Sequence, residues 1–292
     1  MMPTFISRPL LLAGTLLSLA LVSACSPPPP AAVEGEVIQK PGVTLQWLTD
    51  HDRIAPGDSF TVGLLIQHDP GFHTYWRSPG IVGLAPAIGW DLPEGITAGP
   101  IQWPGPEVTK MAKIVAWGYE RDVLLTTTIK VDPDFSEAVI PLKSEVSWMA
   151  CSDTCHPGWA NLALEIPTGP SYPNQANAEL FERAIDELPI HLPADWKFHL
   201  STIASNESEW TVVQLESPEK LSADGAVFFC GDNQVNSDLP QTITETAGGL
   251  ELRFPHSEFA PEDATVFEGL LFHPEGWPSL ESRWVRVSAP LP

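Results

Sequence analysis

Residues 143–166 read KSEVSWMACSDTCHPGWANLALEI and contain two strand-like segments, Lys143–Met149 and Trp159–Ile166. Between them lies Ser152-Asp153-Thr154, whose side chains are of the kind that bond nearby backbone groups in turns. The chain is therefore expected to fold back on itself here as a β-hairpin. Two cysteines, Cys151 and Cys155, would then face each other across a three-residue loop.

Most of the remaining sequence also has the features of short β-strands. Gly and Pro recur about every 8–12 residues, and helical periodicity is rare. A protein with many short strands separated by turns is expected to form β-sandwiches, so we predict an all-β fold. The other expected strands are Thr44–Leu48, Ser59–His68, Ala87–Asp91, Val123–Val131, Lys197–Ile203, Trp210–Leu215, Gly225–Cys230, Gly249–Phe254, Glu268–His273 and Arg283–Val287.

One segment differs, because Asn174–Leu188 carries apolar residues at helical spacing and is followed by Pro189. We predict a single short helix within a linker that joins two β-sandwich domains. The expected organisation is a signal peptide at 1–24, a Pro-rich tether at 25–40, a first sandwich at 41–167, the linker and helix at 168–188, and a second sandwich at 189–292.

The composition narrows the possible partners. Among the 292 residues, 15 Lys and Arg stand against 37 Asp and Glu, a formal net charge of −22. This acidity argues against nucleic acid as a partner and against electrostatic docking on anionic lipid. Hydrophobic residues make up 43% of the chain, enough for folded cores.

The N-terminus has the features of a lipoprotein signal. Residues 10–24, LLLAGTLLSLALVSA, form an apolar run of 15 residues, shorter than the roughly 20 needed to span a bilayer. Small residues precede Cys25, as in a bacterial lipobox, where cleavage is followed by lipidation of the thiol. An ordinary signal peptidase site is the alternative. We expect a lipid-anchored protein of the bacterial cell envelope that faces the periplasm, with Pro27–Pro30 as part of its extended tether.

Three interpretations fit the pair Cys151 and Cys155. Four residues of continuous strand span about 13 Å, whereas a disulfide requires Cα atoms about 4.4–6.8 Å apart, so a bridged pair needs the turn. So small a ring removes little entropy from the unfolded chain, which favours an exchangeable bond over a permanent staple. The third interpretation is a copper(I) or zinc site of Cys151, Cys155 and His156. If the pair holds no metal, His156 is instead expected to lower the pKa of a thiol of the pair.

The fourth cysteine and two further histidines are not expected to carry chemistry. Cys230 ends the apolar segment Gly225–Cys230 and is interpreted as a small buried hydrophobic residue. His68 and His73 flank a turn at Asp69-Pro70-Gly71, and neither is predicted to be a ligand.

Four motifs, in order along residues 42–167, carry a resemblance to a known family. They are PGFHTYWRSPG at 70–80, the stretch from LPEG at 92–95 to IQWP at 101–104, GYE at 118–120, and the stretch from VSW at 146–148 through Cys151, Cys155 and Pro157. In this region the chain resembles the N-terminal periplasmic domain of the thiol:disulfide interchange protein DsbD, and more closely the related ScsB-type proteins. The second β domain is similar to the additional domain of ScsB-like members.

The resemblance implies an immunoglobulin-like domain in which Cys151 and Cys155 shuttle electrons. In the family, the pair receives reducing equivalents from a membrane partner and passes them to periplasmic oxidoreductases or other oxidised thiol proteins. No cofactor is expected beyond the redox-active disulfide; copper enters only under the metal-site alternative. Phe72, Tyr75, Trp76 and Tyr119 are expected either to pack in the sandwich core or to wall off the disulfide.

The chain departs from the family in two respects. The family's cap loop corresponds to Glu107–Val115, which lacks the aromatic cap residues, and the multi-span membrane module of full-length DsbD is absent from this sequence. Electrons are therefore expected from a separate membrane protein of the DsbD/ScsB type. The runner-up functions are a copper-relay lipoprotein and a pair of immunoglobulin-like modules that mediate protein contact.

Overall fold

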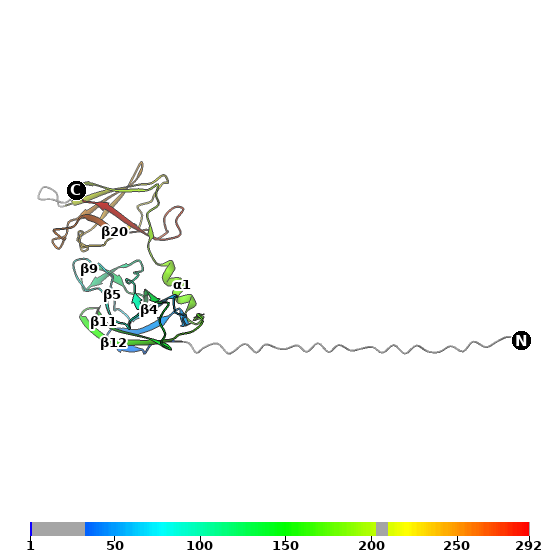
Figure 1. Cartoon of the computed structure of the whole chain (residues 1–292). Coiled ribbons are helices and arrows are strands. Elements are labelled where there is room, and N and C mark those ends of the chain that lie inside the picture. The colour runs from blue at the N-terminus through cyan, green and yellow to red at the C-terminus, as the bar shows by residue number, and fades with distance from the viewer. Residues whose placement is uncertain (2–32, 203–209, 292) are drawn as a thin grey trace. The chain divides into compact units, whose positions relative to one another are not determined.

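The computed structural model describes residue 1, residues 33–202 and residues 210–291. The expected signal peptide, the lipidation site Cys25 and the tether as far as residue 32 lie outside these residues. From Val33 onward, the described residues belong to one compact unit. Figure 1 follows the chain in colour from the first strands through the helix to the last strands.

The first part of the chain folds into sheets that we call the N-terminal sheets. The five-stranded sheet has the order β1-β2-β4-β10-β7 (Ile38–Lys40, Val43–Thr49, Ser59–His68, Val123–Val131, Ile96–Ala98). The hairpin sheet has the order β12-β11-β6 (Cys155–Pro167, Val139–Cys151, Ala87–Asp91). Two smaller sheets are β5-β9-β8 (Thr74–Tyr75, Ile114–Tyr119, Glu107–Met111) and β13-β3 (Tyr172–Pro173, His51–Arg53).

The core of the N-terminal sheets lies between the five-stranded sheet and the hairpin sheet. Along β11, buried residues alternate with more exposed ones, as in a strand with one face turned to a core. Across the core, the Trp47 indole N–H donates to Ser144 Oγ at 3.0 Å, and the Trp47 ring stacks on Trp90 at 4.9 Å. The predicted all-β, immunoglobulin-like sandwich is confirmed, and β4, β6 and β10 have the predicted bounds.

The predicted helix is present but shorter than its sequence pattern. Helix α1 spans Ala178–Asp186, whereas the pattern extended from 174 to 188. The Asn174 side chain accepts hydrogen bonds from the backbone N–H groups of Ala176 and Asn177, and this turn delays the start of the helix. Phe181 and its neighbour Ala184 are buried against the five-stranded sheet, so the expected linker is packed. No helix in the described ranges is long and apolar enough to cross a membrane.

Two four-stranded sheets, the C-terminal sheets, form the second part. Their orders are β14-β21-β20-β17 (Ile190–His191, Trp284–Pro290, Val266–Phe272, Val227–Cys230) and β15-β16-β19-β18 (Lys197–Thr202, Trp210–Glu216, Gly249–Pro255, Thr242–Thr246). The ring of Phe228 stacks on Phe254 of the other sheet at 4.5 Å and on Phe267 of its own sheet at 5.4 Å. The residues 203–209 lie outside the description, so the expected end of the strand at Ile203 is not covered.

Aromatic and charged contacts join the two sets of sheets. Phe229, which is buried, meets the rings of Trp76 at 6.5 Å and Trp117 at 5.8 Å. Beside them, Arg77 forms an ion pair with Glu268 at 3.1 Å. Buried aromatic contacts contribute strongly to such interfaces, so Phe229 anchors the two parts to each other.

Candidate functional site

The cysteine pair lies at the tip of the β11–β12 hairpin. The two strands pair continuously up to Cys151 opposite Cys155, and the two sulfur atoms form a disulfide with Cα atoms 4.2 Å apart. The turn between them is closed by a hydrogen bond from Ser152 N–H to Thr154 O at 3.0 Å. The strand pairing and this turn thus place the two residues face to face.

The two cysteines differ in exposure. Cys151 has 0% of its surface exposed and is clustered with Tyr75 and Ala116. Cys155 is only partly buried, at the edge of the same cluster. An incoming thiol therefore reaches the sulfur of Cys155 first, because the sulfur of Cys151 is covered by protein.

A histidine lies directly beside Cys151 on the side away from Cys155. His73 and Cys151 exchange both backbone hydrogen bonds, each at 2.9 Å, as an antiparallel pair. Residues paired in this way lie about 5.5 Å apart at their Cα atoms and direct their side chains to the same face. His73, Cys151 and Cys155 therefore form a row across three chain segments, with their side chains on one face.

The environment of His73 is apolar. Its side chain is 2% exposed, and its Nε2 atom finds no hydrogen-bond partner among the described residues. Burial lowers the pKa of His73 from its ordinary value, which keeps the imidazole neutral at pH 7. Burial likewise lowers the pKa of His68, which bonds Thr74 Oγ1 through Nε2 at 2.9 Å, to about 4.

Tyr75 completes the buried wall of the disulfide. Its ring meets the His73 ring edge-on at 5.1 Å, and its side chain is packed in the cluster with Cys151. Within the described part of the chain, the Tyr75 hydroxyl group has no hydrogen-bond partner, and burial raises its pKa to about 12. Two uncharged polar groups, an imidazole and a phenol, thus lie next to Cys151.

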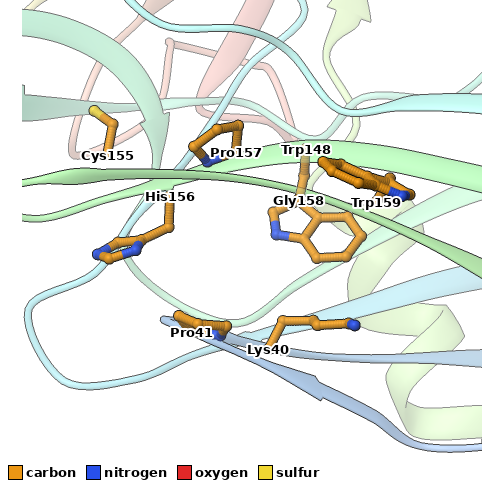
Figure 2. A pocket seen from close by; sticks show the side chains of 8 residues that line it. All are labelled: Lys40, Pro41, Trp148, Cys155, His156, Pro157, Gly158 and Trp159. Atoms are coloured by element: carbon orange, nitrogen blue, oxygen red, sulfur yellow. The ribbon is translucent and has the colours of Figure 1, made fainter.

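His156, the histidine that the sequence pattern favoured, lies on the other face of the hairpin. Successive side chains alternate along a strand, and Figure 2 shows the side chains of Cys155 and His156 leaving β12 in opposite directions. The His156 ring meets Phe72 at 5.7 Å, and its Nε2 lies 3.1 Å from Thr154 Oγ1. The structure therefore places His73, rather than His156, on the face of the sheet that carries the two sulfur atoms. The described residues contain no group of three or more His, Cys, Asp or Glu side chains placed to hold a metal ion.

The other aromatic residues of the predicted site have different surroundings. Trp76 is buried against Phe229 and lies beneath the guanidinium group of Arg77 at 5.0 Å. The buried hydroxyl of Tyr119 donates to Pro104 O at 2.8 Å, and burial raises its pKa well above the ordinary value. These contacts place Trp76 and Tyr119 in the core, and Phe72 packs at its edge.

The segment that corresponds to the cap is a β-hairpin formed by β8 and β9. Met111, at its tip, packs against the cluster that contains Cys155. The C-terminal sheets hold this hairpin through a loop: Asp238 accepts from Val115 N–H, and the Ser237 hydroxyl donates to Val115 O, both at 2.8 Å. The hairpin thus contributes a methionine to the cluster around the pair, where the family has an aromatic cap.

A groove of about 370 Å³ lies along the outer side of β12, next to Cys155 (Figure 2). Trp148 forms part of its wall, and Gly158 leaves room for that ring, since a Cβ atom at 158 would lie 2.6 Å from the ring. Trp159 is 71% exposed at the same groove. The lining residues are Lys40, Pro41, Trp148, Cys155, His156, Pro157, Gly158 and Trp159.

Cys230 has the surroundings of a core residue, as expected. Its side chain is fully buried, and burial raises the pKa of its thiol. The thiol lies 3.1 Å from Asp232 Oδ1. This thiol is therefore chemically inert in the folded protein.

The local sequence does not reveal that His73 lies beside Cys151, because this neighbourhood depends on a contact between distant segments. The only local signal was its place within the motif at 70–80. That motif gives no indication that residue 73 pairs with residue 151, because the pairing forms only when the β5 segment packs beside the end of β11.

Comparison with known proteins agrees with this geometry. Residues 45–166 match the family model "Thiol:disulfide interchange protein DsbD, N-terminal". A comparison with curated proteins found no match.

Two solved structures are similar to the chain. The N-terminal periplasmic domain of ScsB from Proteus mirabilis matches with a TM-score of 0.63 and 17% identity, over 89% of this chain and 99% of that one. A conserved domain protein from Bacillus anthracis matches with a TM-score of 0.27 and 12% identity, over 88% of each chain. The similarity to the ScsB domain extends beyond residue 166 and is one of fold. Residues 45–166, which contain both cysteines of the hairpin, therefore form a domain of the DsbD N-terminal family of thiol:disulfide interchange proteins.

Proposed function

We propose that this protein carries out thiol–disulfide exchange in the periplasm through Cys151 and Cys155. The observation that carries the proposal is a disulfide at a hairpin tip that has one buried and one accessible sulfur, within a domain of the interchange family. The protein acts as an electron-transfer component between a membrane donor and oxidised protein thiols.

Reduction of the pair begins at Cys155. A thiolate of the donor attacks Cys155 Sγ, the bond between the two sulfur atoms breaks, and the electron pair leaves on Cys151 Sγ. The second thiol of the donor then attacks its own sulfur in the mixed disulfide, which releases Cys155 as a thiolate. Both electrons now reside on the protein as two thiols.

Delivery to a substrate follows the same route in reverse. The Cys155 thiolate attacks a disulfide of the partner protein, and one partner thiolate leaves. Cys151 then attacks Cys155 Sγ, the intramolecular disulfide forms again, and the second partner thiolate leaves. Cys155 therefore makes the intermolecular bond and Cys151 resolves it, because Cys155 is accessible and Cys151 is buried.

The groove beside Cys155 is the surface that a redox partner covers in this proposal. It presents the exposed indole of Trp159, and exposed aromatic residues are typical anchors of protein interfaces. A Trp159→Ala variant is expected to exchange normally with small thiols and to react more slowly with protein partners.

The electron donor is proposed to be a separate membrane protein of the DsbD/ScsB type. Lipidation of Cys25 and the Pro-rich tether would hold the protein near that donor. A Cys25→Ser variant with an uncleaved or alternative signal is expected to lose activity in cells while the purified protein keeps its exchange chemistry. Equal activity in cells without the anchor would contradict this part of the proposal.

The decisive experiment is the reduction potential of the pair, measured by equilibration with glutathione and dithiothreitol buffers. A potential above about −300 mV identifies an exchangeable disulfide, and one well below it identifies a structural bond. Reduction of an oxidised protein substrate should be lost in Cys151→Ser and Cys155→Ser, whereas Cys230→Ala serves as the matched control. A copper(I) titration of the reduced protein in parallel tests the copper-relay alternative, which predicts tight binding that is lost in His156→Ala.

A further inference from the structure

In the resolving step, the buried thiol of Cys151 must act as a nucleophile. The nucleophile in thiol–disulfide exchange is the thiolate, so the Cys151 thiol must lose its proton before it attacks Cys155. Cys151 is fully buried in a cluster with Tyr75 and Ala116, where a thiolate is disfavoured. Solvent does not reach this sulfur, so the proton needs an acceptor within the protein.

His73 is the group placed to accept that proton. Its backbone is paired with Cys151 by two hydrogen bonds of 2.9 Å, so the two side chains leave the sheet on the same face. The contact of its ring with Tyr75, itself packed in the cluster with Cys151, places the imidazole on that face independently. The Nε2 atom is buried and has no partner among the described residues, which leaves it free for a proton from sulfur.

We propose that His73 Nε2 accepts the proton of the Cys151 thiol when Cys151 resolves the mixed disulfide. In this step the bond between Cys151 Sγ and Cys155 Sγ forms, and the bond between Cys155 Sγ and the partner sulfur breaks. The electron pair leaves on the partner sulfur. The proton moves from Cys151 to His73 and then to the departing thiolate, which leaves the partner as a thiol. The inference rests on the proposed exchange function and adds the proton acceptor to it.

The surrounding groups favour a neutral base at this position. The titratable side chains around the imidazole are the Tyr75 phenol on the same face, the two cysteines, and His68, whose electrostatic interaction with His73 is unfavourable when both are charged. Burial lowers the pKa of His73, so the imidazole is unprotonated at pH 7 and its lone pair is available. Tyr75 has a pKa of about 12 and is protonated at this pH, so it is not a base.

The test separates the two exchange steps within one reaction. The full-length chain carrying Cys25→Ser is reduced and mixed rapidly with an equimolar amount of dithiobis(nitrobenzoate), and the released thionitrobenzoate is followed by absorbance. The first phase reports attack by Cys155, and the second reports resolution by Cys151. We expect His73→Gln and His73→Ala to leave the first phase unchanged and to slow the second about 10-fold at pH 7. A loss of about 100-fold in the fraction of Cys151 thiolate, offset by a gain of about 10-fold in its nucleophilicity, leaves this factor.

The pH profile distinguishes a proton acceptor from a packing role. In the unmodified chain, the second phase is expected to level off by pH 7, above the pKa of His73. In His73→Gln, it should keep rising into the alkaline range in which the thiol itself ionises. His273→Ala is the matched control. His273 is also buried against an aromatic ring, Trp277, and its Nε2 has no partner in the described part of the chain, but it directly follows β20 of the C-terminal sheets.

The outcomes distinguish this inference from the proposed function. If the unmodified chain shows no second phase, the exchange function itself fails. If the second phase is present and both His73 variants resolve at the unmodified rate with an unchanged pH profile, the exchange function stands and the role of His73 is refuted. A Tyr75→Phe variant that reproduces the slow phase, while His73→Gln does not, would also refute it. Both phases are measured in the same molecules. A loss of folded protein would change both phases and is therefore excluded as the cause when only the second phase slows relative to the first.

Discussion

Reduction of the Cys151–Cys155 bond should leave the protein folded, with only a small loss of stability. The bond closes a loop with a sequence separation of 4. For so short a loop, the chain-entropy relation gives a stabilisation of about 2 kcal/mol at 25 °C, compared with about 4.7 kcal/mol for a loop of roughly 100 residues. The hairpin ladder and the backbone pairing of Cys151 with His73 do not depend on the bond, so they hold the site in place after reduction.

This small value is linked to the redox chemistry. Because 30 mV corresponds to about 1.4 kcal/mol for a two-electron couple, a difference of about 2 kcal/mol means that folding makes the pair only about 40 mV more reducing than in the unfolded chain. An electron carrier must stay folded in both redox states, so its disulfide can contribute only a little to the stability of the fold. A structural disulfide would contribute much more.

The assay is urea denaturation of the oxidised and the reduced protein, followed by tryptophan fluorescence. We expect a single cooperative transition in both states and a difference of about 2 kcal/mol in the free energy of unfolding. The double variant Cys151→Ala/Cys155→Ala should show a similar loss without any reductant. A loss of about 4 kcal/mol or more on reduction, or the disappearance of the cooperative transition, would show that the bond stabilises the fold as a staple and would refute the reasoning.

Three further predictions concern acid stability, packing and thiol reactivity. Burial lowers the pKa of His68 from 6.5 to about 4, so between these pH values the unfolded chain binds a proton that the folded chain does not. The free energy of unfolding should therefore fall by up to about 3 kcal/mol as the pH drops from 6.5 to 4. In His68→Gln, the free energy of unfolding measured by urea denaturation should depend less on pH, and an equal dependence would contradict this. Phe229→Ala, which removes a buried ring from between the two sets of sheets, should lower the free energy of unfolding by about 3–5 kcal/mol, and a loss below about 1 kcal/mol would exclude it as the anchor. In the reduced, folded protein, iodoacetamide should label Cys155 first and Cys230 only after unfolding, as mass spectrometry can show; early labelling of Cys230 would disprove its burial.

Much of the fold could be predicted because the strands carry local signals. The segments 59–68, 87–91 and 123–131 became β4, β6 and β10 with the predicted bounds. In contrast, the short strands β5, β8 and β9 were not predicted, since a two-residue strand such as Thr74–Tyr75 has no periodicity of its own. The helix was predicted four residues too early at its start, because its apolar spacing does not reveal that the Asn174 side chain captures the first backbone N–H groups.

The candidate site shows the same division. The cysteine pair, the turn between its members and the proposed exchangeable character of so short a loop follow from the local sequence. The choice of histidine does not, since adjacency in sequence favoured His156, which strand alternation directs to the opposite face. His73 lies 78 positions before Cys151 (151 − 73). No local sequence pattern therefore reveals the two backbone hydrogen bonds that join them.

The sequence by itself determined the class of fold and the cysteines that carry the proposed chemistry, and it predicts a lipid anchor at Cys25, because each depends on residues that are close together along the chain. Only the tertiary structure decided which sulfur is accessible, which base lies beside the buried one and what covers the pair. These properties come from contacts among β5, β8 and β11, and burial is a property of the packed molecule rather than of any segment. The same packing that hides Cys151 from solvent places His73 on the same face of the sheet, with an Nε2 atom that finds no hydrogen-bond partner among the described residues.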